Sequence, residues 1–159
     1  MDHKGHKDHK GYPGHTGWLV FVVFVIFVVQ AFSTGAQQVS PSRSVWDGVY
    51  SAAQAKRGEP LYAQYCSSCH GTTFEGGEMA PPLAGGTFNA NWNGLSLGDL
   101  YERIRISMPQ NSPNSLGRQQ YADILATMLA AGEFPPGSSE LAREADALRQ
   151  ISFQSTRPQ

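Results

Sequence analysis

The sequence predicts an all-α protein with one small domain. Several segments carry apolar residues at helical spacing, and no segment shows the alternation expected of a strand. Stretches rich in Gly and Pro separate these segments and predict long loops. The 159 residues are 40% apolar and 16% charged, which suits one globular domain with an appendage.

The appendage is the N-terminal segment. Residues 18–29 form an unbroken apolar run, with lysines before it at positions 4, 7 and 10 and small residues after it up to Ala36. This pattern predicts a signal peptide over 1–36. An uncleaved membrane anchor is the weaker alternative, because the run is shorter than the ~20 residues that cross a bilayer. The histidines at positions 3, 6 and 9 suggest a metal-binding tract, but we assign them to the discarded segment.

Without residues 1–36 the chain carries 9 basic and 11 acidic side chains, a formal charge of −2. Nucleic acid is therefore not an expected partner. Lys56 is the single lysine of this part, so electrostatic steering of a partner should be weak.

Residues 37–44 are polar, contain Pro41 and predict a linker, followed by a domain over 45–153 and a tail over 154–159.

The first helix is expected over 49–65. Gly58 is either a weak point of this helix or a site of close approach to another helix. Pro60 predicts a break or a kink just before it.

Residues 71–94 are rich in Gly, Pro and Asn and predict a long ordered loop around a bound group. A short helix is expected over 97–106, with Asp99 near its start. A second loop then runs to Leu116. The clearest amphipathic pattern covers 117–131 and ends at Gly132. A last helix is expected over 139–149.

The segment Cys66-Ser67-Ser68-Cys69-His70 contains the only two cysteines of the chain. Two thiols at this spacing with an adjacent histidine are the pattern of covalent c-type haem attachment. The thiols add to the haem vinyl groups, and His70 ligates the iron. This interpretation agrees with export, because c-type haem is attached outside the cytoplasm where the arrangement is known.

Three other interpretations of the cysteines are weaker. A thioredoxin-like motif would follow a strand, whereas the preceding segment here is helical. A zinc site needs two further Cys or His ligands, and every other histidine lies at position 15 or earlier. A disulfide between Cys66 and Cys69 would close a very short loop and leave His70 unexplained.

The second axial ligand is chosen among three methionines. Met128 lies in the middle of an apolar helix stripe, where Met usually fills the core. Met79 follows His70 by only nine residues. Met108 stands at the end of a helix, before Pro109 and a loop, and is the assigned ligand. Met79 and an open position remain as alternatives. Ligation by His and Met raises the reduction potential and fills both axial positions.

The chain resembles class I c-type cytochromes, in particular the small exported ones found with quinoprotein dehydrogenases. The resemblance covers about 45–151 and is carried by 44–50, 66–71, 80–85, 107–109 and 121–126. It implies the cytochrome c fold, with three main helices around one covalently bound haem, haem-wrapping loops and a short additional C-terminal helix.

The resemblance also implies site residues. The Pro81 carbonyl is expected to accept a hydrogen bond from the ring nitrogen of His70 that faces away from the iron. In the alternative, Pro81 is an ordinary loop proline without this role. Trp92, with Asn91, is expected to line a haem propionate edge, with ordinary burial as the alternative. The family often has an aromatic residue where this chain has Thr127, so the usual aromatic contact with the first helix near Gly58 is in doubt.

These features predict an exported, periplasmic monohaem cytochrome that carries single electrons and is not itself an enzyme. We expect a monomer that meets redox proteins, with a dehydrogenase as donor and an oxidase or another cytochrome as acceptor. In a close variant it is the electron-accepting subunit of a dehydrogenase complex. Membrane contact is expected only if the N-terminal segment is retained. The alternative function is a haem-based sensor in which a ligand displaces Met108.

Overall fold

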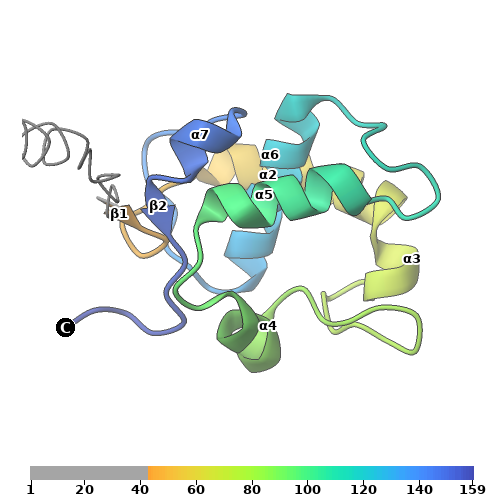
Figure 1. Cartoon of the computed structure of the whole chain (residues 1–159), viewed down its shortest axis with the longest axis horizontal. Helices are drawn as coiled ribbons and strands as arrows, with labels where there is room; N and C mark the ends of the chain where they lie inside the picture. Colours follow the sequence, from red (N-terminus) through yellow and green to blue (C-terminus); the bar gives the residue numbers. More distant parts are fainter. Residues whose placement is uncertain (1–42) are drawn as a thin grey trace, which may run out of the picture. The chain divides into compact units, whose positions relative to one another are not determined.

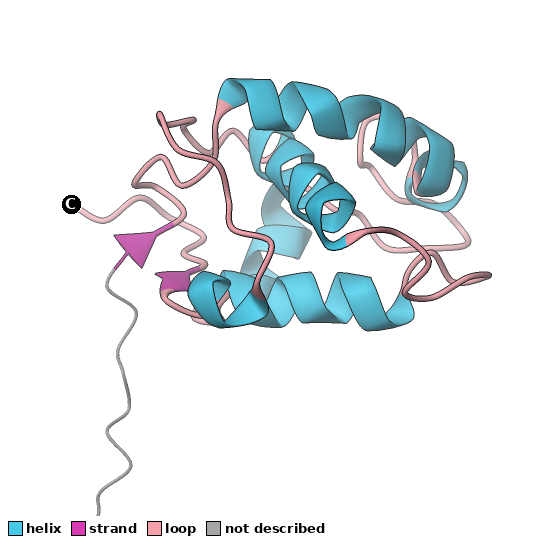
Figure 2. Ribbon diagram, turned by 90° about the horizontal axis from the view of Figure 1, so that it is seen from above, coloured by secondary structure: helices cyan, strands magenta, loops and turns pink. Residues whose placement is uncertain are grey.

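The computed structural model describes residues 43–159, so the predicted signal peptide and most of the predicted linker lie outside the described residues. Figures 1 and 2 show helices joined by long loops, with two very short strands near the C-terminus. The predicted all-α class is confirmed. In chain order the elements are β1 (Arg43–Ser44), α2 (Ala52–Tyr65), α3 (Ser67–His70), α4 (Gly85–Trp92), α5 (Leu97–Ser107), α6 (Arg118–Ala131), α7 (Ala145–Leu148) and β2 (Ile151–Ser152).

Helices α2 and α6 pack closely at Gly58. A Cβ atom at this position would collide with the Asp123 carbonyl and the Thr127 hydroxyl, so only glycine permits this approach. Thr127 Oγ1 lies 2.7 Å from Ala55 O and donates across the interface. A hydrogen bond between α2 and α6 therefore exists at the position where the family often has an aromatic residue.

The three longer helices agree with the expected ones. Helix α2 continues through Pro60 without ending, and its N-cap Ser51 accepts a hydrogen bond from the Gln54 main-chain N–H. Helix α5 begins with a capping box between Ser96 and Asp99. Helix α6 begins after Gly117, and Gly132 caps its C-terminal end.

The core lies between α2, α5, α6 and the C-terminal segment. Its aromatic members include Tyr101 and Tyr121, whose rings meet edge to face with centroids 6.4 Å apart. Phe153 joins the C-terminal segment to this core and contacts Phe88 and Phe134. The largest fully buried side chains are Tyr101, Tyr121, Phe153, Leu97, Leu100, Ile124, Leu125, Leu129, Leu148, Gln54, Val45 and Val49.

The expected loop over 71–94 is wrong in its second half, because α4 forms there. Two glycines at the start of α4 give it a weak intrinsic preference for helix. Phe88 is nevertheless buried against Phe153 and lies near Trp92, one helical turn later. Tertiary packing of these rings therefore stabilises a helix that the local composition disfavours.

The expected helix over 139–149 is also wrong in its first half, since only α7 is helical. The Gln54 side chain accepts from the Leu141 main-chain N–H at 2.7 Å and donates to the Leu141 carbonyl at 3.2 Å. Both main-chain groups are thus bound by a side chain, and Leu141 is buried without a helix.

The expectation of no strand is wrong, although the exception is small. Arg43 and Ser44 pair in parallel with Ile151 and Ser152. These two N-terminal residues fall in the segment that the sequence assigns to the linker, and Ser44 is buried. Each strand has only two residues, which is too short for an alternating pattern to be recognised in the sequence.

Within residues 43–159, no helix is both long enough and apolar enough to cross a membrane.

Candidate haem site

The two cysteines and His70 lie on one turn that directly follows α2. The Cys66 N–H donates to Tyr62 O at 2.9 Å, and the His70 N–H donates to Cys66 O at 3.0 Å. This turn is α3, which Figure 1 shows at the end of the domain opposite β1 and β2. Because Cys66 and Cys69 are three residues apart on a helical turn, their side chains leave the same face.

Both thiols are free, with Cys66 half-buried and Cys69 exposed. Burial raises the pKa of the Cys66 thiol to about 11, so this thiol is neutral at pH 7. A thioredoxin-like cysteine needs the opposite shift, because its thiolate is the reactive form. Among residues 43–159, no group of three or more His, Cys, Asp or Glu side chains is placed to hold a metal ion.

His70 is held in one orientation by a main-chain carbonyl. Its ring is buried, and Nδ1 lies 2.8 Å from Pro81 O. A carbonyl oxygen only accepts hydrogen bonds, so Nδ1 carries the proton and Nε2 has the free lone pair. This is the arrangement of a histidine that ligates a metal through Nε2 and is oriented through Nδ1.

Met108 is the C-cap residue of α5, and its main chain is bound on both sides. Its N–H donates to Ile104 O at 2.8 Å, and its carbonyl accepts from the Tyr121 hydroxyl at 2.9 Å. Its side chain is half-buried. In contrast, Met79 is 78% exposed and Met128 is buried in the core. Of these three methionines, only Met108 lies at a helix end with a partly exposed side chain.

Trp92 ends α4, is partly buried and packs against the core, while Asn91 is exposed. Asn89, on the same helix, was not among the residues predicted from the sequence. Its side-chain oxygen is buried and has no hydrogen-bond partner within the described chain. A buried amide without a partner is unfavourable by about 1–3 kcal/mol, so a polar partner from outside the protein chain is expected there. No sequence pattern distinguishes Asn89 from the other asparagines of this region.

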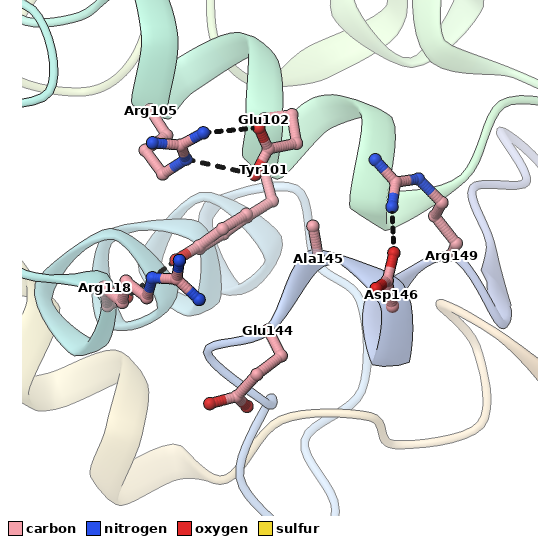
Figure 3. A pocket seen from close by; sticks show the side chains of 8 residues that line it. All are labelled: Tyr101, Glu102, Arg105, Arg118, Glu144, Ala145, Asp146 and Arg149. Atoms are coloured by element: carbon pink, nitrogen blue, oxygen red, sulfur yellow. Dashed lines mark hydrogen bonds and ion pairs between the residues drawn. The ribbon is translucent and has the colours of Figure 1, made fainter.

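A polar hollow of about 310 Å³ lies away from these residues, between α5, α7 and the start of α6 (Figure 3). Its charged side chains largely pair with each other. Arg105 binds Glu102, and Arg149 binds Asp146. The hollow contains none of the predicted haem residues, which are Cys66, Cys69, His70, Pro81, Trp92 and Met108.

The residues present fit a covalently attached haem. Two free thiols stand one helical turn apart, His70 has Nε2 available for iron, and a soft thioether stands at the end of α5. Attachment needs free thiols, and a buried imidazole with a protonated Nδ1 is suited to one metal bond. The chemistry of this set is that of a c-type haem and not of a thiol oxidoreductase.

This combination of helical fold and attachment motif defines a cytochrome c domain. Residues 53–126 match the family described as Cytochrome C oxidase, cbb3-type, subunit III. The matched segment begins in α2 and ends in α6, so it includes Cys66, Cys69, His70 and Met108. The described part of the chain is thus a mostly helical cytochrome c domain, and haem-based electron transfer is the activity that such a domain implies.

Among solved structures, that of the sulfane dehydrogenase SoxCD from Paracoccus pantotrophus is similar. The similarity has a TM-score of 0.44 at 22% identity, and it covers 74% of this chain and 62% of that chain. No curated protein is similar enough in sequence to count as a match.

Proposed function

We propose that this protein is an exported monohaem c-type cytochrome of class I that transfers single electrons between redox proteins. Cys66 and Cys69 would attach the haem, and His70 and Met108 would be the ligands of its iron. Bound haem supplies an iron that alternates between the ferric and ferrous states. Residues of this chain attach the group, orient His70 and hold Met108 at the end of α5.

One observation carries this proposal, namely the contact of 2.8 Å between His70 Nδ1 and Pro81 O. A buried histidine with a purely structural role is expected to use both ring nitrogens for hydrogen bonds. Here the buried ring binds a carbonyl through Nδ1, and His70 directly follows Cys69, one of two free thiols. The same hydrogen bond strengthens electron donation from the ring to a bound metal.

Filling both axial positions favours electron transfer over catalysis at the iron, because no position is left for a substrate. The competing sensor function requires that a small molecule displaces Met108. Two hydrogen bonds hold the Met108 main chain at 2.8 and 2.9 Å, which opposes such a displacement. We also place Trp92 and Asn89 in the haem environment, with Asn89 as the polar contact.

The proposed partners are proteins, with a dehydrogenase as donor and an oxidase or another cytochrome as acceptor. The sequence pattern of residues 1–36 supports export to the periplasm, and the domain is expected to act as a monomer. With Lys56 as the only lysine after residue 36, docking relies little on electrostatic steering. Reaction rates with the partner should therefore depend weakly on ionic strength.

The test is to express the full chain together with a cytochrome c maturation system. The proposal predicts a protein whose mass increases by one haem and whose iron is reversibly reduced by one electron. Cys66→Ala serves as a matched control, because it removes one of the two attachment bonds. If the wild-type protein acquires no covalent haem under these conditions, the proposal is wrong. If carbon monoxide binds the ferrous protein readily at neutral pH, the sensor function replaces electron transfer.

A further inference from the structure

The Pro81 carbonyl belongs to a loop that contains no helix or strand between His70 and Gly85. Three main-chain hydrogen bonds order this loop. They join Gly76 N to His70 O at 2.8 Å, Gly77 N to Ala80 O at 2.9 Å and Leu83 N to Phe74 O at 2.9 Å. The last of these connects Phe74 to the residue two positions after Pro81. Phe74 is thus connected to the segment that carries the Pro81 carbonyl.

Phe74 has an unfavourable backbone conformation. Its φ is +64°, in the left-handed region that a bulky side chain rarely adopts. Such a conformation persists only where the surroundings hold it. Here the surroundings are an aromatic stack, because the rings of Phe74 and Tyr62 have centroids 3.9 Å apart and an interplanar angle of 26°.

Tyr62 makes a second contact with the same loop. Its side chain is 3% exposed, and its hydroxyl donates to the Gly71 carbonyl at 2.6 Å. The ring of this tyrosine thus contacts the middle of the loop, and its hydroxyl binds the residue directly after His70. Because Tyr62 is part of α2, it connects both points to a rigid element.

Thr127 explains why the aromatic partner of Tyr62 comes from the loop. A hollow of about 150 Å³ beside Tyr62 is lined by Phe74 and by Thr127 of α6. Thr127 has a short side chain, so α6 offers no ring at this position. The stack therefore joins α2 to the loop that carries Pro81, and not α2 to α6.

We propose that Tyr62 and Phe74 form a positioning pair that holds the Pro81 carbonyl against His70 Nδ1 and thereby lowers the reduction potential. This inference depends on the proposed function. A hydrogen bond from Nδ1–H to a carbonyl increases electron donation by the imidazole, which stabilises ferric iron more than ferrous iron. Loosening the loop weakens this bond, so the ferrous state gains stability and the potential rises.

The experiment compares the reduction potentials of the full-length holoprotein and its variants. Phe74→Ala removes the ring that holds this backbone conformation, and alanine does not favour a positive φ either. It should shift the equilibrium towards ferrous iron about threefold to tenfold, which corresponds to about 30–60 mV for one electron. Phe74→Tyr keeps the stack and should retain the wild-type potential. Tyr62→Phe removes only the hydroxyl and should give a smaller upward shift. It also serves as the second variant if Phe74→Ala does not accumulate as holoprotein.

A second measurement separates positioning from general stability. Exchange of the His70 Nδ1 proton with solvent, followed by NMR of the ferrous protein, should become faster in Phe74→Ala. Thr127→Val is the matched control, because it removes the hydrogen bond from α6 to Ala55 without touching the loop hydrogen bonds. It should lower the melting temperature and leave the potential unchanged.

Three outcomes would contradict the inference. Unchanged potential and unchanged proton exchange in Phe74→Ala would show that the pair does not position Pro81, while the proposed function would stand. An equal shift in Thr127→Val would show a general effect of stability. A wild-type protein that acquires no haem would overturn both the inference and the proposed function.

Discussion

The loop after His70 and the loop after Met108 each hold one residue at positive φ, but by different means. Each contains a residue other than glycine with positive φ, Phe74 at +64° and Asn114 at +59°. Asparagine adopts this region readily, so the turn at Asn114 is encoded locally. Phenylalanine does not, and Phe74 depends on its stack with Tyr62. Long-range packing therefore fixes the loop that carries Pro81, while local polar groups fix the loop after Met108.

The hydrogen bonds of the two loops show the same difference. After Met108, Asn114 N–H donates to Arg105 O at 3.0 Å, and Arg105 Nη1 donates to the exposed Asn114 side chain at 2.9 Å. The hydrogen bond that comes from a buried residue is the one from the Tyr121 hydroxyl to Met108 O. On the other side, the Tyr62 hydroxyl and ring both act from the core. We therefore expect the His70 side to be rigid and the Met108 side to be easier to disturb.

The largest difference is expected from removing the ligands themselves. His70→Ala should abolish the holoprotein, because haem attachment needs the complete motif. Met108→Ala should keep the haem and lower the potential, within the range of roughly 0.8 V that axial ligands set. Spectra of the purified holoprotein and redox titration measure both effects. Equal loss of haem in both variants would contradict the expectation that His70 and Met108 have different roles in holding the haem.

The contact between α2 and α6 lies outside both loops, so a change there should lower the stability of the whole fold. Gly58→Ala introduces a Cβ against the Asp123 carbonyl and should destabilise the fold by about 1–3 kcal/mol. Thermal and denaturant unfolding of the holoprotein measure this value. Gly86→Ala is the matched control, because a Cβ at Gly86 meets nothing within 4 Å. A Gly58→Ala protein as stable as the wild type would contradict the close approach.

A smaller effect is expected from the hydroxyl that holds Met108. Tyr121→Phe removes its hydrogen bond to Met108 O and should release about 1 kcal/mol of restraint. Added imidazole should then replace Met108 with about fivefold higher affinity. Tyr101→Phe is the control, because its hydroxyl binds Arg118 O and Arg143 O instead. Unchanged imidazole affinity in Tyr121→Phe would show that this bond does not hold the ligand.

The smallest effect concerns acid pH, where each loop has a neighbouring carboxylate with a lowered pKa. Hydrogen bonds from its own main-chain N–H and from Thr73 lower the pKa of Glu75 below its ordinary value of 4.5. A hydrogen bond from Arg105 does the same for the pKa of Glu102. Because both pKa values are lowered by folding, these carboxylates stabilise the protein above pH 4.5, and the contribution is lost as pH falls below that value.

Melting temperatures of the holoprotein between about pH 3 and about pH 7 test this prediction. Glu75→Gln and Glu102→Gln should each flatten the acid side of the profile slightly. A wild-type profile that stays level below pH 4.5 would show that neither carboxylate contributes to stability.

The sequence predicted the elements that local patterns encode. Periodic apolar residues located α6, and a short apolar pattern with Asp99 near its start located α5. The spacing of Cys66, Cys69 and His70 indicated where a haem would be attached. These signals are short in range, which is why one sequence is enough to find them.

Features that depend on distant partners could not be predicted. Helix α4 forms because Phe88 meets Phe153, and residues 139–144 stay outside a helix while Gln54 binds Leu141. The stack of Phe74 on Tyr62 and the buried amide of Asn89 likewise have no local signal. In the first three cases the deciding contact joins residues that lie far apart or in different elements, and in the last the partner is not found within the described chain.

The most direct test of the proposed ligation is the near-infrared absorption of the ferric holoprotein, where a sulfur-to-iron bond gives a weak band. We expect the band in the wild type and in Met79→Leu, and its loss in Met108→Ala. A band that persists in Met108→Ala, or that is absent from the wild type, would contradict the assignment of His70 and Met108 as the ligands of an electron-transfer haem.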